Sequence, residues 1–532
     1  MTWEKLNNTW HYVEKWAAEK PDAECLVHDE VRLTWREFKE KMDRAVKAFI
    51  KAGVEKGDRV AMIAMACPEF LITYMAAGKA GATWLGLTPK FTREELLYQV
   101  GDSKPTVLIT IREYLGTDLA DNIKVLMEEY SFIKKVLVIG EPVEGTESYE
   151  EYAGAERTEL DGELEDRAAL AEYEDEALLL YTSGSTGKPK GVVHTHKSII
   201  ENIKVEVKHL LFDEGSRGLL HFPINHVAAD VEIGFACILG GGCIVCMEKF
   251  DPVKTLKIIE EEKLTVLGQV PVMFLLEMKQ PEFFETDFSS IKQFAWAGAA
   301  APKMMLGVLD DLRKKHGAML LTGYGSTEVC GFITYSDPDD DMETLATTAG
   351  KVAEGFELKI VDDDRKELPD GEVGEITVRG PFLMKGYLNK PEATVECVDA
   401  DGWYYTNDLA FKDERGYIHI TGRKSEMFKT GGENVFPREV EDAIESHPAI
   451  IFAAVIAALD EIFQEVGWAF CMLIPGQSVT EDELKAHCKE KLANFKVPKK
   501  FFVRPELPLL QTGKVNKMAL KEEMKKIVAG SE

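Results

Sequence analysis

The sequence has little of what marks a secreted or membrane-spanning protein. Its nine cysteines are scattered along 532 residues, and the one close pair, Cys243 and Cys246, lacks the second pair of ligands that a zinc site needs. We expect these two thiols to be reduced and buried. No basic segment followed by an apolar one opens the chain, and the longest apolar stretch, residues 233–247, contains Gly240–Gly242 and is too short to cross a bilayer. The sequence therefore predicts a cytoplasmic protein without an integral membrane segment.

Positive charge is also scarce. The chain has 63 Lys and Arg residues against 92 Asp and Glu residues, so its formal net charge is −29 at pH 7. A protein that neutralises nucleic-acid phosphates normally presents a basic face, so nucleic acid is not an expected partner. Net charge says nothing about a single cleft, and a local basic pocket for a nucleotide or a coenzyme stays open.

Chain length and pattern predict an α/β protein with more than one domain. A chain of 532 residues exceeds what a single core needs. Up to about residue 330, short apolar runs alternate with helical patterns, which indicates βαβ units and stacked, mainly parallel sheets. Residues 350–422 show short strands and turns, which favour a smaller β-barrel-like subdomain. An α+β pattern then begins, so we predict a large N-terminal domain of residues 1–423 and a small C-terminal domain of residues 424–532.

The segment 181–191, with the sequence YTSGSTGKPKG, has the composition of a phosphate-binding loop. It follows a predicted buried strand at 177–181 and leads towards a predicted helix at 198–211. Glycines let backbone N–H groups approach phosphate oxygens, hydroxyl groups add donors, and lysines supply charge. The segment is not a Walker A loop, because Pro189 stands where Ser or Thr is required. The predicted phosphate-binding residues are Thr182, Ser183, Gly184, Ser185, Thr186, Gly187, Lys188 and Lys190.

This loop resembles the signature loop of the adenylate-forming superfamily, which comprises acyl-CoA synthetases, luciferases and peptide-synthetase adenylation domains. Further motifs follow in the order found in that superfamily, at residues 323–328, 407–408, 422–423 and 507–517, so the resemblance covers essentially the whole chain. It implies an enzyme that uses ATP and Mg²⁺ to convert a carboxylic acid to an acyl-adenylate. In the acyl-CoA synthetase branch, coenzyme A then takes the acyl group.

The motif GYGSTE at 323–328 follows an apolar run, so it is predicted to leave the end of a strand, where α/β proteins bind ligands. By resemblance, Tyr324 packs on adenine and Thr327 binds the α-phosphate. Glu328 would hold Mg²⁺ together with Thr186, since this hard cation prefers oxygen ligands. The resemblance assigns further nucleotide contacts to Gly323, Gly325 and Ser326, and to Gly298, Ala299 and Ala300 in the segment 296–302.

Three more residues complete the nucleotide and catalytic site that the resemblance implies. Asp408 would accept hydrogen bonds from the ribose hydroxyls, and Arg423 would reach the nucleotide. Lys514, in the motif LPLLQTGKVNK, is the predicted catalytic lysine, because its point charge can stabilise the negative charge that builds between the carboxylate and the α-phosphate.

The phosphate loop and Lys514 lie in different predicted domains, so the C-terminal domain is expected to be mobile. Closure would first bring Lys514 to ATP, and rotation would then present Lys429, Gly431 and Gly432 for attack by a thiol. Many relatives carry Asp or Lys at the pivot, where this chain has Ser425. We expect rotation about Lys424 and Ser425.

The segment 221–230 matches the family motif that lines the carboxylate pocket, and it makes His226 a candidate catalytic residue. Amino-acid-activating relatives place Asp at this position, so an acid without an α-amino group is expected. Asp230 and Glu232 could favour a polar substrate or form an ion pair at the pocket rim, and the sequence leaves both open. The expected acid is medium-chain, branched or ring-bearing.

Three functions remain compatible with the sequence. The first is an AMP-forming acyl-CoA ligase. The second is an acyl-adenylate-forming enzyme that delivers the acyl group to a carrier protein or to oxygen, and the third is a non-catalytic nucleotide sensor. The intact set of Thr186, Glu328, Asp408, Arg423 and Lys514 argues against the sensor. A homodimer is possible.

Overall fold

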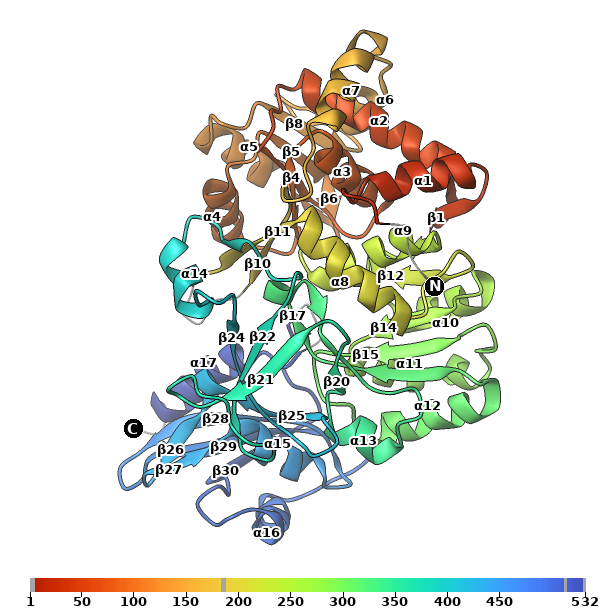
Figure 1. Ribbon diagram of the computed structural model, residues 1–532. Helices are drawn as coiled ribbons and strands as arrows, with labels where there is room; N and C mark the ends of the chain where they lie inside the picture. The colour runs from red at the N-terminus through yellow and green to blue at the C-terminus, as the bar shows by residue number, and fades with distance from the viewer. Residues whose placement is uncertain (1–4, 183–187, 511–513, 530–532) are drawn as a thin grey trace.

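The computed structural model describes residues 5–182, 188–510 and 514–529. Figure 1 shows a large N-terminal part, coloured red to cyan, and a smaller C-terminal part in blue. Within the described ranges, no helix has both the length and the apolar character needed to cross a membrane. The predicted α/β fold, with a large N-terminal and a small C-terminal part, is confirmed.

The first large sheet has eight strands in the order β23-β11-β10-β4-β3-β5-β8-β9. The central strands β10, β4, β3, β5 and β8 are parallel, whereas β11 is antiparallel to β10. The strands are β3 (Arg59–Ile63), β4 (Thr83–Leu87), β5 (Val107–Ile111), β8 (Lys135–Ile139), β9 (Glu147–Ser148), β10 (Glu176–Thr182), β11 (Lys190–Thr195) and β23 (Gly386–Tyr387).

The second large sheet has seven strands in the order β16-β15-β14-β12-β13-β1-β2, all parallel except β2. Cys243 and Cys246 lie buried on β13 as free thiols. The strands are β1 (Glu24–His28), β2 (Val31–Thr34), β12 (Arg217–Leu220), β13 (Cys243–Cys246), β14 (Val266–Gln269), β15 (Gln293–Trp296) and β16 (Met319–Thr322).

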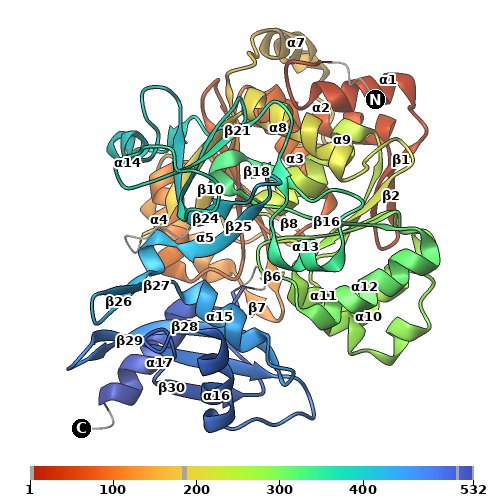
Figure 2. The same ribbon diagram turned by 60° about the horizontal axis from the view of Figure 1, so that its bottom comes forward.

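Helices fill the space between these sheets and cover their outer faces (Figures 1 and 2). Helix α3 packs on β1 of the second sheet and on β3, β4 and β10 of the first, which explains why every residue in it except Glu69 is buried. The helices of the N-terminal part are α1 (His11–Glu19), α2 (Trp35–Lys51), α3 (Pro68–Lys79), α4 (Arg93–Ser103), α5 (Ala120–Glu129), α6 (Tyr149–Gly154), α7 (Asp161–Ala169), α8 (His196–His209), the π-helix η2 (Ala228–Phe235), α9 (Ala236–Gly240), α10 (Pro252–Glu261), α11 (Pro271–Met278), α12 (Lys303–His316), α13 (Met342–Thr347) and α14 (Pro391–Cys397).

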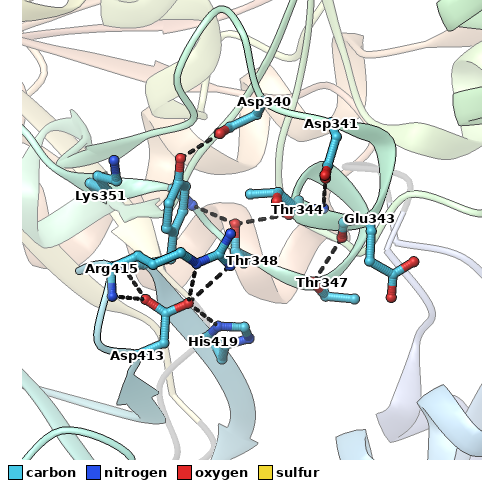
Figure 3. Close-up of polar contacts among 12 residues, drawn as sticks. Asp340, Asp341, Glu343, Thr344, Thr347, Thr348, Lys351, Asp413, Arg415 and His419 are labelled. Atoms are coloured by element: carbon cyan, nitrogen blue, oxygen red, sulfur yellow. Dashed lines mark hydrogen bonds and ion pairs between the residues drawn. The ribbon is translucent and has the colours of Figure 1, made fainter.

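A smaller antiparallel sheet follows, made of β21 (Glu357–Val361), β22 (Gly374–Arg379), β24 (Tyr404–Lys412) and β25 (Ile418–Arg423). Polar contacts hold its β24–β25 turn to the segment that leads into α13 (Figure 3). Asp413 accepts hydrogen bonds from Arg415 and from His419, and the Tyr417 hydroxyl donates to Asp340. This sheet is therefore fixed to the large α/β part by side chains as well as by the chain itself.

The C-terminal part has its own sheet, ordered β27-β26-β29-β28 with β30 beside β29, and its own apolar core. Its elements are β26 (Phe428–Thr430), β27 (Glu433–Val435), α15 (Pro437–Glu445), β28 (Ile450–Asp460), β29 (Gln464–Leu473), α16 (Glu481–Lys491), β30 (Lys500–Arg504) and α17 (Lys517–Ala529). A short 3-10 turn, Lys424–Glu426, connects it to β25. The change of sheet supports our proposal of a domain boundary after Arg423.

One local prediction was wrong. The sequence predicted a loop throughout 182–191, but the structure pairs Tyr181 with Gly191 and Thr182 with Lys190 in the antiparallel ladder of β10 and β11. Thr182, Lys190 and Gly191 thus belong to paired strands. Helix α8 also begins at His196, earlier than predicted, because Thr195 caps it by accepting a hydrogen bond from the backbone N–H of Ser198.

Candidate active site

The motif at 323–328 follows strand β16, as predicted, and packs tightly against β18 (Gly331–Phe332). A Cβ atom on Gly323 would lie 2.1 Å from the carbonyl oxygen of Thr334, and one on Gly325 would lie 1.9 Å from that of Gly331. No side chain fits at either distance. Both glycines are therefore required for the path that carries Tyr324 and Thr327 into the site.

Tyr324, Asp408 and Arg423 form one hydrogen-bonded group. The Tyr324 hydroxyl donates to one carboxylate oxygen of Asp408 at 2.7 Å, and Arg423 Nε donates to the other at 3.1 Å. Asp408 and Arg423 are direct partners in the ladder of β24 and β25, so the sheet register sets their spacing. Burial and the Asp408 charge raise the pKa of Tyr324 well above its ordinary value, which keeps its hydroxyl a donor.

The phosphate-loop hairpin is connected to Thr327 and Glu328. Tyr387 donates to Glu328 Oε1 at 3.0 Å, and the Lys190 ammonium lies 4.8 Å from the centre of the Tyr387 ring. Nε2 of His194, on β11, lies 2.6 Å from the Thr327 carbonyl oxygen and must carry the proton that it donates. Burial lowers the pKa of His194 to about 4, so this ring is neutral.

Two predicted loop residues at the described ends are less enclosed. Thr182 is half-buried at the end of β10, and Lys188 is exposed, with its ammonium 5.4 Å from the centre of the Tyr98 ring. Ser183, Gly184, Ser185, Thr186 and Gly187 lie outside the described residues.

Glu328 has one carboxylate oxygen engaged by Tyr387, which leaves the other for a cation. In the described part of the chain, no group of three or more His, Cys, Asp or Glu side chains is arranged to hold a metal ion. Magnesium in nucleotide enzymes is commonly held by one or two carboxylates and by substrate phosphates. The Glu328 carboxylate, of which Tyr387 engages one oxygen, fits that kind of site.

Lys514 reaches the N-terminal part from the C-terminal part. It is held at the end of a short antiparallel bridge, in which Leu509 faces Val515 and the Leu510 N–H donates to the Lys514 carbonyl at 2.7 Å. A Cβ atom on Gly298 would lie 3.0 Å from Lys514 Cε and 3.7 Å from Nζ. The absence of a side chain at Gly298 thus lets Lys514 approach the segment 296–302.

The charges around Lys514 belong to the predicted site. Burial lowers the pKa of Lys514 and Arg423 lowers it further, whereas Asp408 and Glu232 raise it. Burial, with a smaller contribution from Lys514, lowers the pKa of His226 to about 4. The structure therefore brings Lys514, Asp408, Arg423 and His226 into one electrostatic environment.

The loop that carries His226 is fixed against the first sheet. A Cβ atom on Gly86 would lie 1.8 Å from the Ile224 carbonyl oxygen, so strand β4 and this loop can touch only because Gly86 has no side chain. The Ala228 N–H donates to His226 Nδ1 at 3.2 Å. In the neutral ring the proton is then on Nε2, which is free to donate to a substrate carboxylate.

The sequence pattern of the AMP-binding enzyme family matches residues 13–388, and that of the AMP-binding enzyme C-terminal domain matches residues 439–514. The chain belongs to the AMP-binding enzyme family. The medium-chain acyl-CoA ligase ACSF2, mitochondrial, of Mus musculus is 30% identical over 532 residues, covering 95% of this chain and 85% of that protein. The prediction of an ATP-dependent enzyme of the acyl-CoA synthetase type is confirmed.

Two solved structures resemble this chain over nearly its whole length. The anthranilate CoA ligase AuaEII in complex with anthranoyl-AMP is 26% identical, with a TM-score of 0.88 and 98% of each chain covered. ATP-bound MatB from Rhodopseudomonas palustris is 27% identical, with a TM-score of 0.83 over 98% of this chain and 100% of that chain. The structure of apo MatB has a lower TM-score with this chain, 0.75. The arrangement of this AMP-binding enzyme is thus closer to that of ATP-bound MatB than to that of the apo form.

Several predicted site residues of this AMP-binding enzyme are exposed or have no partner within the site. Lys429, Gly431 and Gly432 are on the β26–β27 hairpin, at the outer edge of the C-terminal part (Figures 1 and 2). The Lys429 N–H donates to Glu465 and the Gly431 N–H to the Phe463 carbonyl, so these contacts stay within the C-terminal sheet. Ala299 and Ala300 are exposed, and the buried Ser326 hydroxyl has no partner among the described residues.

Sequence reasoning missed two side chains near the site. Tyr387 positions Glu328, and nothing in its own segment signals that role. Glu206 lies buried on α8 among Ile199, Ile203 and Val207, which form the apolar face of that helix. A carboxylate at a core position of an amphipathic helix is a signal that the sequence did contain.

Proposed function

We propose that this AMP-binding enzyme is an acid–thiol ligase of the AMP-forming type. A carboxylic acid and ATP would give an acyl-adenylate and pyrophosphate, and coenzyme A would then give acyl-CoA and AMP. The position of Lys514 against Gly298, in the electrostatic environment of Asp408 and Arg423, carries the proposal. The similarity to ATP-bound MatB and to AuaEII with anthranoyl-AMP supports it.

The nucleotide would lie between the motif at 323–328 and strands β24 and β25. Tyr324 would pack on adenine, with the segment containing Gly298, Ala299 and Ala300 as one wall. Asp408 would accept hydrogen bonds from the ribose hydroxyls, and its two contacts with Tyr324 and Arg423 would hold it in place. Gly323, Gly325 and Ser326 would form the turn that contacts the nucleotide next to Tyr324.

In the first half-reaction, a carboxylate oxygen of the acid attacks the α-phosphorus of ATP, and the bond from that phosphorus to the oxygen of the leaving pyrophosphate breaks. Lys514 and the Thr327 hydroxyl would stabilise the charge on the α-phosphate. Neutral His226 would donate from Nε2 to the acid and orient it. Thr182, Lys188, Lys190 and residues 183–187 would bind the departing pyrophosphate.

Mg²⁺ would neutralise phosphate charge. Glu328 would hold it, with Thr186 as the second proposed ligand. Tyr387 would keep one Glu328 oxygen engaged and so aim the other at the phosphates.

In the second half-reaction, the C-terminal part would rotate about Lys424 and Ser425, withdrawing Lys514 and bringing Lys429, Gly431 and Gly432 to coenzyme A. The connection is now held by specific contacts. Asn407 Nδ2 donates to the Ser425 hydroxyl at 3.0 Å, and Lys424 pairs with Asp363 at 2.7 Å. Rotation must break or rearrange these exposed contacts, which are individually weak.

The acid would be medium-chain, branched or ring-bearing. Apolar side chains near the proposed carboxylate position support this class. Val270 Cγ1 would lie 3.7 Å from a Cβ atom on Gly298, and Phe222 stacks near His226 with ring centres 6.5 Å apart. The names of ACSF2 and AuaEII, a medium-chain acyl-CoA ligase and an anthranilate CoA ligase, fall within the same range.

Pyrophosphate release across a panel of acids, with and without coenzyme A, tests the proposal. We expect pyrophosphate and acyl-AMP without coenzyme A, and acyl-CoA with it. Acyl-AMP that never becomes acyl-CoA would contradict the ligase and favour delivery to a carrier protein. Light scattering of the purified enzyme tests whether it forms a homodimer. Its location in cells tests the proposed cytoplasmic localisation.

Lys514→Ala separates the two half-reactions. We expect loss of ATP-dependent pyrophosphate release by orders of magnitude, because the variant lacks the charge beside the α-phosphate. Conversion of supplied acyl-AMP and coenzyme A should persist. Lys521→Ala, which removes an exposed lysine on α17, is the matched control. Full adenylation by the Lys514 variant would refute the assignment.

A further inference from the structure

Three carboxyl groups lie on two helices that pack together next to the proposed acid site, and all three act on the pKa of Cys330. Glu206 comes from helix α8, and Asp230 and Glu232 come from the π-helix η2, which packs against α8. Glu206 and Asp230 are 0% exposed, and none of their four carboxylate oxygens has a hydrogen-bond partner of adequate geometry among the described residues. Such π-helices occur frequently at functional sites.

Gly331, which follows the nucleotide motif, lies against both Glu206 and Glu232. A Cβ atom on Gly331 would lie 2.8 Å from Glu206 Oε2 and 3.5 Å from Glu232 Cγ. The buried Cys330 thiol has its pKa raised, mainly by burial and then by Glu206, Glu232 and Asp230. Because Gly331 has no side chain, the side chains of Glu206 and Glu232 meet the β18 backbone without an intervening group.

We refer to Glu206, Asp230 and Glu232 as the acidic cluster. Glu232 is the member of this cluster that is influenced by Lys514, the proposed catalytic lysine. Burial raises the pKa of Glu232 to about 7, and the charge of Lys514 opposes that rise. Lys514 and His226 would bind the carboxylate of the acid. The cluster is therefore placed to meet the part of the acid that lies beyond its carboxylate.

Two other buried charges in the described chain are paired with charges of opposite sign. Lys79, 3% exposed, binds Glu14 and Asp43 at 2.7 Å each. Glu441, 4% exposed, binds Lys517 at 2.9 Å. Glu206 and Asp230 differ from these two residues, because no basic side chain of the described residues lowers the pKa of either. Burial raises both pKa values, and the charge of Glu232 raises that of Glu206 further, whereas backbone groups lower them. Leaving a carboxylate buried and unpaired costs several kcal/mol.

We propose that the acid substrate carries a protonated amine at the end remote from its carboxylate, and that Glu232 and Glu206 bind this ammonium group. Burial raises the pKa of Glu206 and Glu232, and an ammonium group, which brings a positive charge and several N–H donors, would favour their ionised form and use the free acceptors of Glu206. The amine is not on the α-carbon, since His226 occupies the position where α-amino acids would meet an Asp. This inference rests on the proposed function and narrows its substrate class.

Matched acids test the inference. Each straight-chain acid in a series of increasing length is prepared with an ammonium, a hydroxyl or a methyl end, and 4-aminomethylbenzoate is compared with 4-ethylbenzoate. The ratio of kcat/KM for the ammonium acid to that for its methyl isostere is measured at each length by pyrophosphate release. We expect this ratio to exceed about tenfold at the best length, equivalent to about 1.4 kcal/mol.

Glu206→Gln and Glu232→Gln should each lower that ratio by about tenfold or more, because each removes one negative charge without changing side-chain size. A ratio measured within one variant is insensitive to partial loss of folded enzyme. Glu282→Gln, at an exposed glutamate, is the control and should leave the ratio unchanged.

The outcomes separate the inference from the proposed function. If methyl-ended or hydroxyl-ended acids are preferred at every length, or if neither cluster variant changes the ratio, the inference is overturned while acid activation stands. If no acid of any kind supports pyrophosphate release, the proposed function itself fails. A preference for ammonium acids that both cluster variants reduce supports both.

Discussion

Glu277 offers a quantitative test of how burial affects this fold. It lies on α11 with 1% of its surface exposed, and Gln269 Nε2 donates to its Oε1 at 2.6 Å. Its second oxygen, Oε2, has no partner among the described residues. Burial raises the pKa of Glu277 from 4.5 to about 8, although the Gln269 contact opposes the rise.

The sign of the effect on stability follows from proton binding. In the unfolded chain the carboxyl ionises near its ordinary pKa, whereas in the folded protein it keeps its proton until about pH 8. Between these values the folded state binds more protons, so stability falls as pH rises, by about 1.4 kcal/mol per pH unit. By about pH 7 the cost reaches at most about 3 kcal/mol, and Glu277→Gln removes it because glutamine does not ionise.

The assay is urea or thermal unfolding of both proteins at about pH 5 and about pH 8. We expect nearly equal stability at the lower pH and a more stable variant at the higher pH, with a midpoint raised by several degrees. The amide oxygen of the substituted side chain can still accept the hydrogen bond from Gln269, so little else changes. Glu282→Gln, on the exposed surface, should show no such pH dependence. A variant that is no more stable at about pH 8 than at about pH 5, relative to the parent, would refute the reasoning.

Three further predictions concern the nucleotide site and the domain connection. Asp408→Asn keeps the side-chain shape but loses the charge that binds Arg423, so the KM for ATP should rise by about 10- to 100-fold. An unchanged KM would contradict the ribose assignment. So would equal loss of activity by parent and variant when ATP is replaced by 2′-deoxy-ATP. Gly298→Ala places a Cβ atom 3.0 Å from Lys514 Cε, at a backbone φ of +84°. Pyrophosphate release should therefore fall by more than about tenfold, while thioester formation from supplied acyl-AMP is spared. Equal loss of both activities would indicate general damage to the fold. Ser425→Pro restricts the backbone at the proposed pivot and should slow thioester formation while sparing adenylation in single-turnover assays, an expectation that fails if both steps slow together.

Regular local patterns made much of the fold predictable. The short strands predicted within 350–422 include β21 (Glu357–Val361), and the apolar runs predicted before residue 330 include the parallel strands β3, β5 and β8. In each case alternation or a short buried run sets the element, and a nearby turn ends it. Strand β11 was missed because its pairing with β10 depends on a hairpin that local composition described only as a loop.

The site was predictable where a motif lies on one segment, and less so where separate segments meet. The hydrogen bond from Tyr387 to Glu328 and the meeting of Glu206 with Glu232 depend on packing between elements distant in sequence. The pattern of 228–235 reads as an apolar helix, and only the fold turns it into a π-helix that carries Asp230 inward. Local propensity does not encode either arrangement.

Arg423 is the last residue of β25, it pairs in register with Asp408, and the proposed pivot begins at the next peptide bond. If the C-terminal part turns there, the strands that hold the nucleotide stay still while Lys514 departs. An adenylate intermediate would then remain where it was made and wait for the thiol, without diffusing between two sites. Isotope-trapping should accordingly find that newly formed acyl-AMP is committed to product and exchanges little with acyl-AMP added from solution.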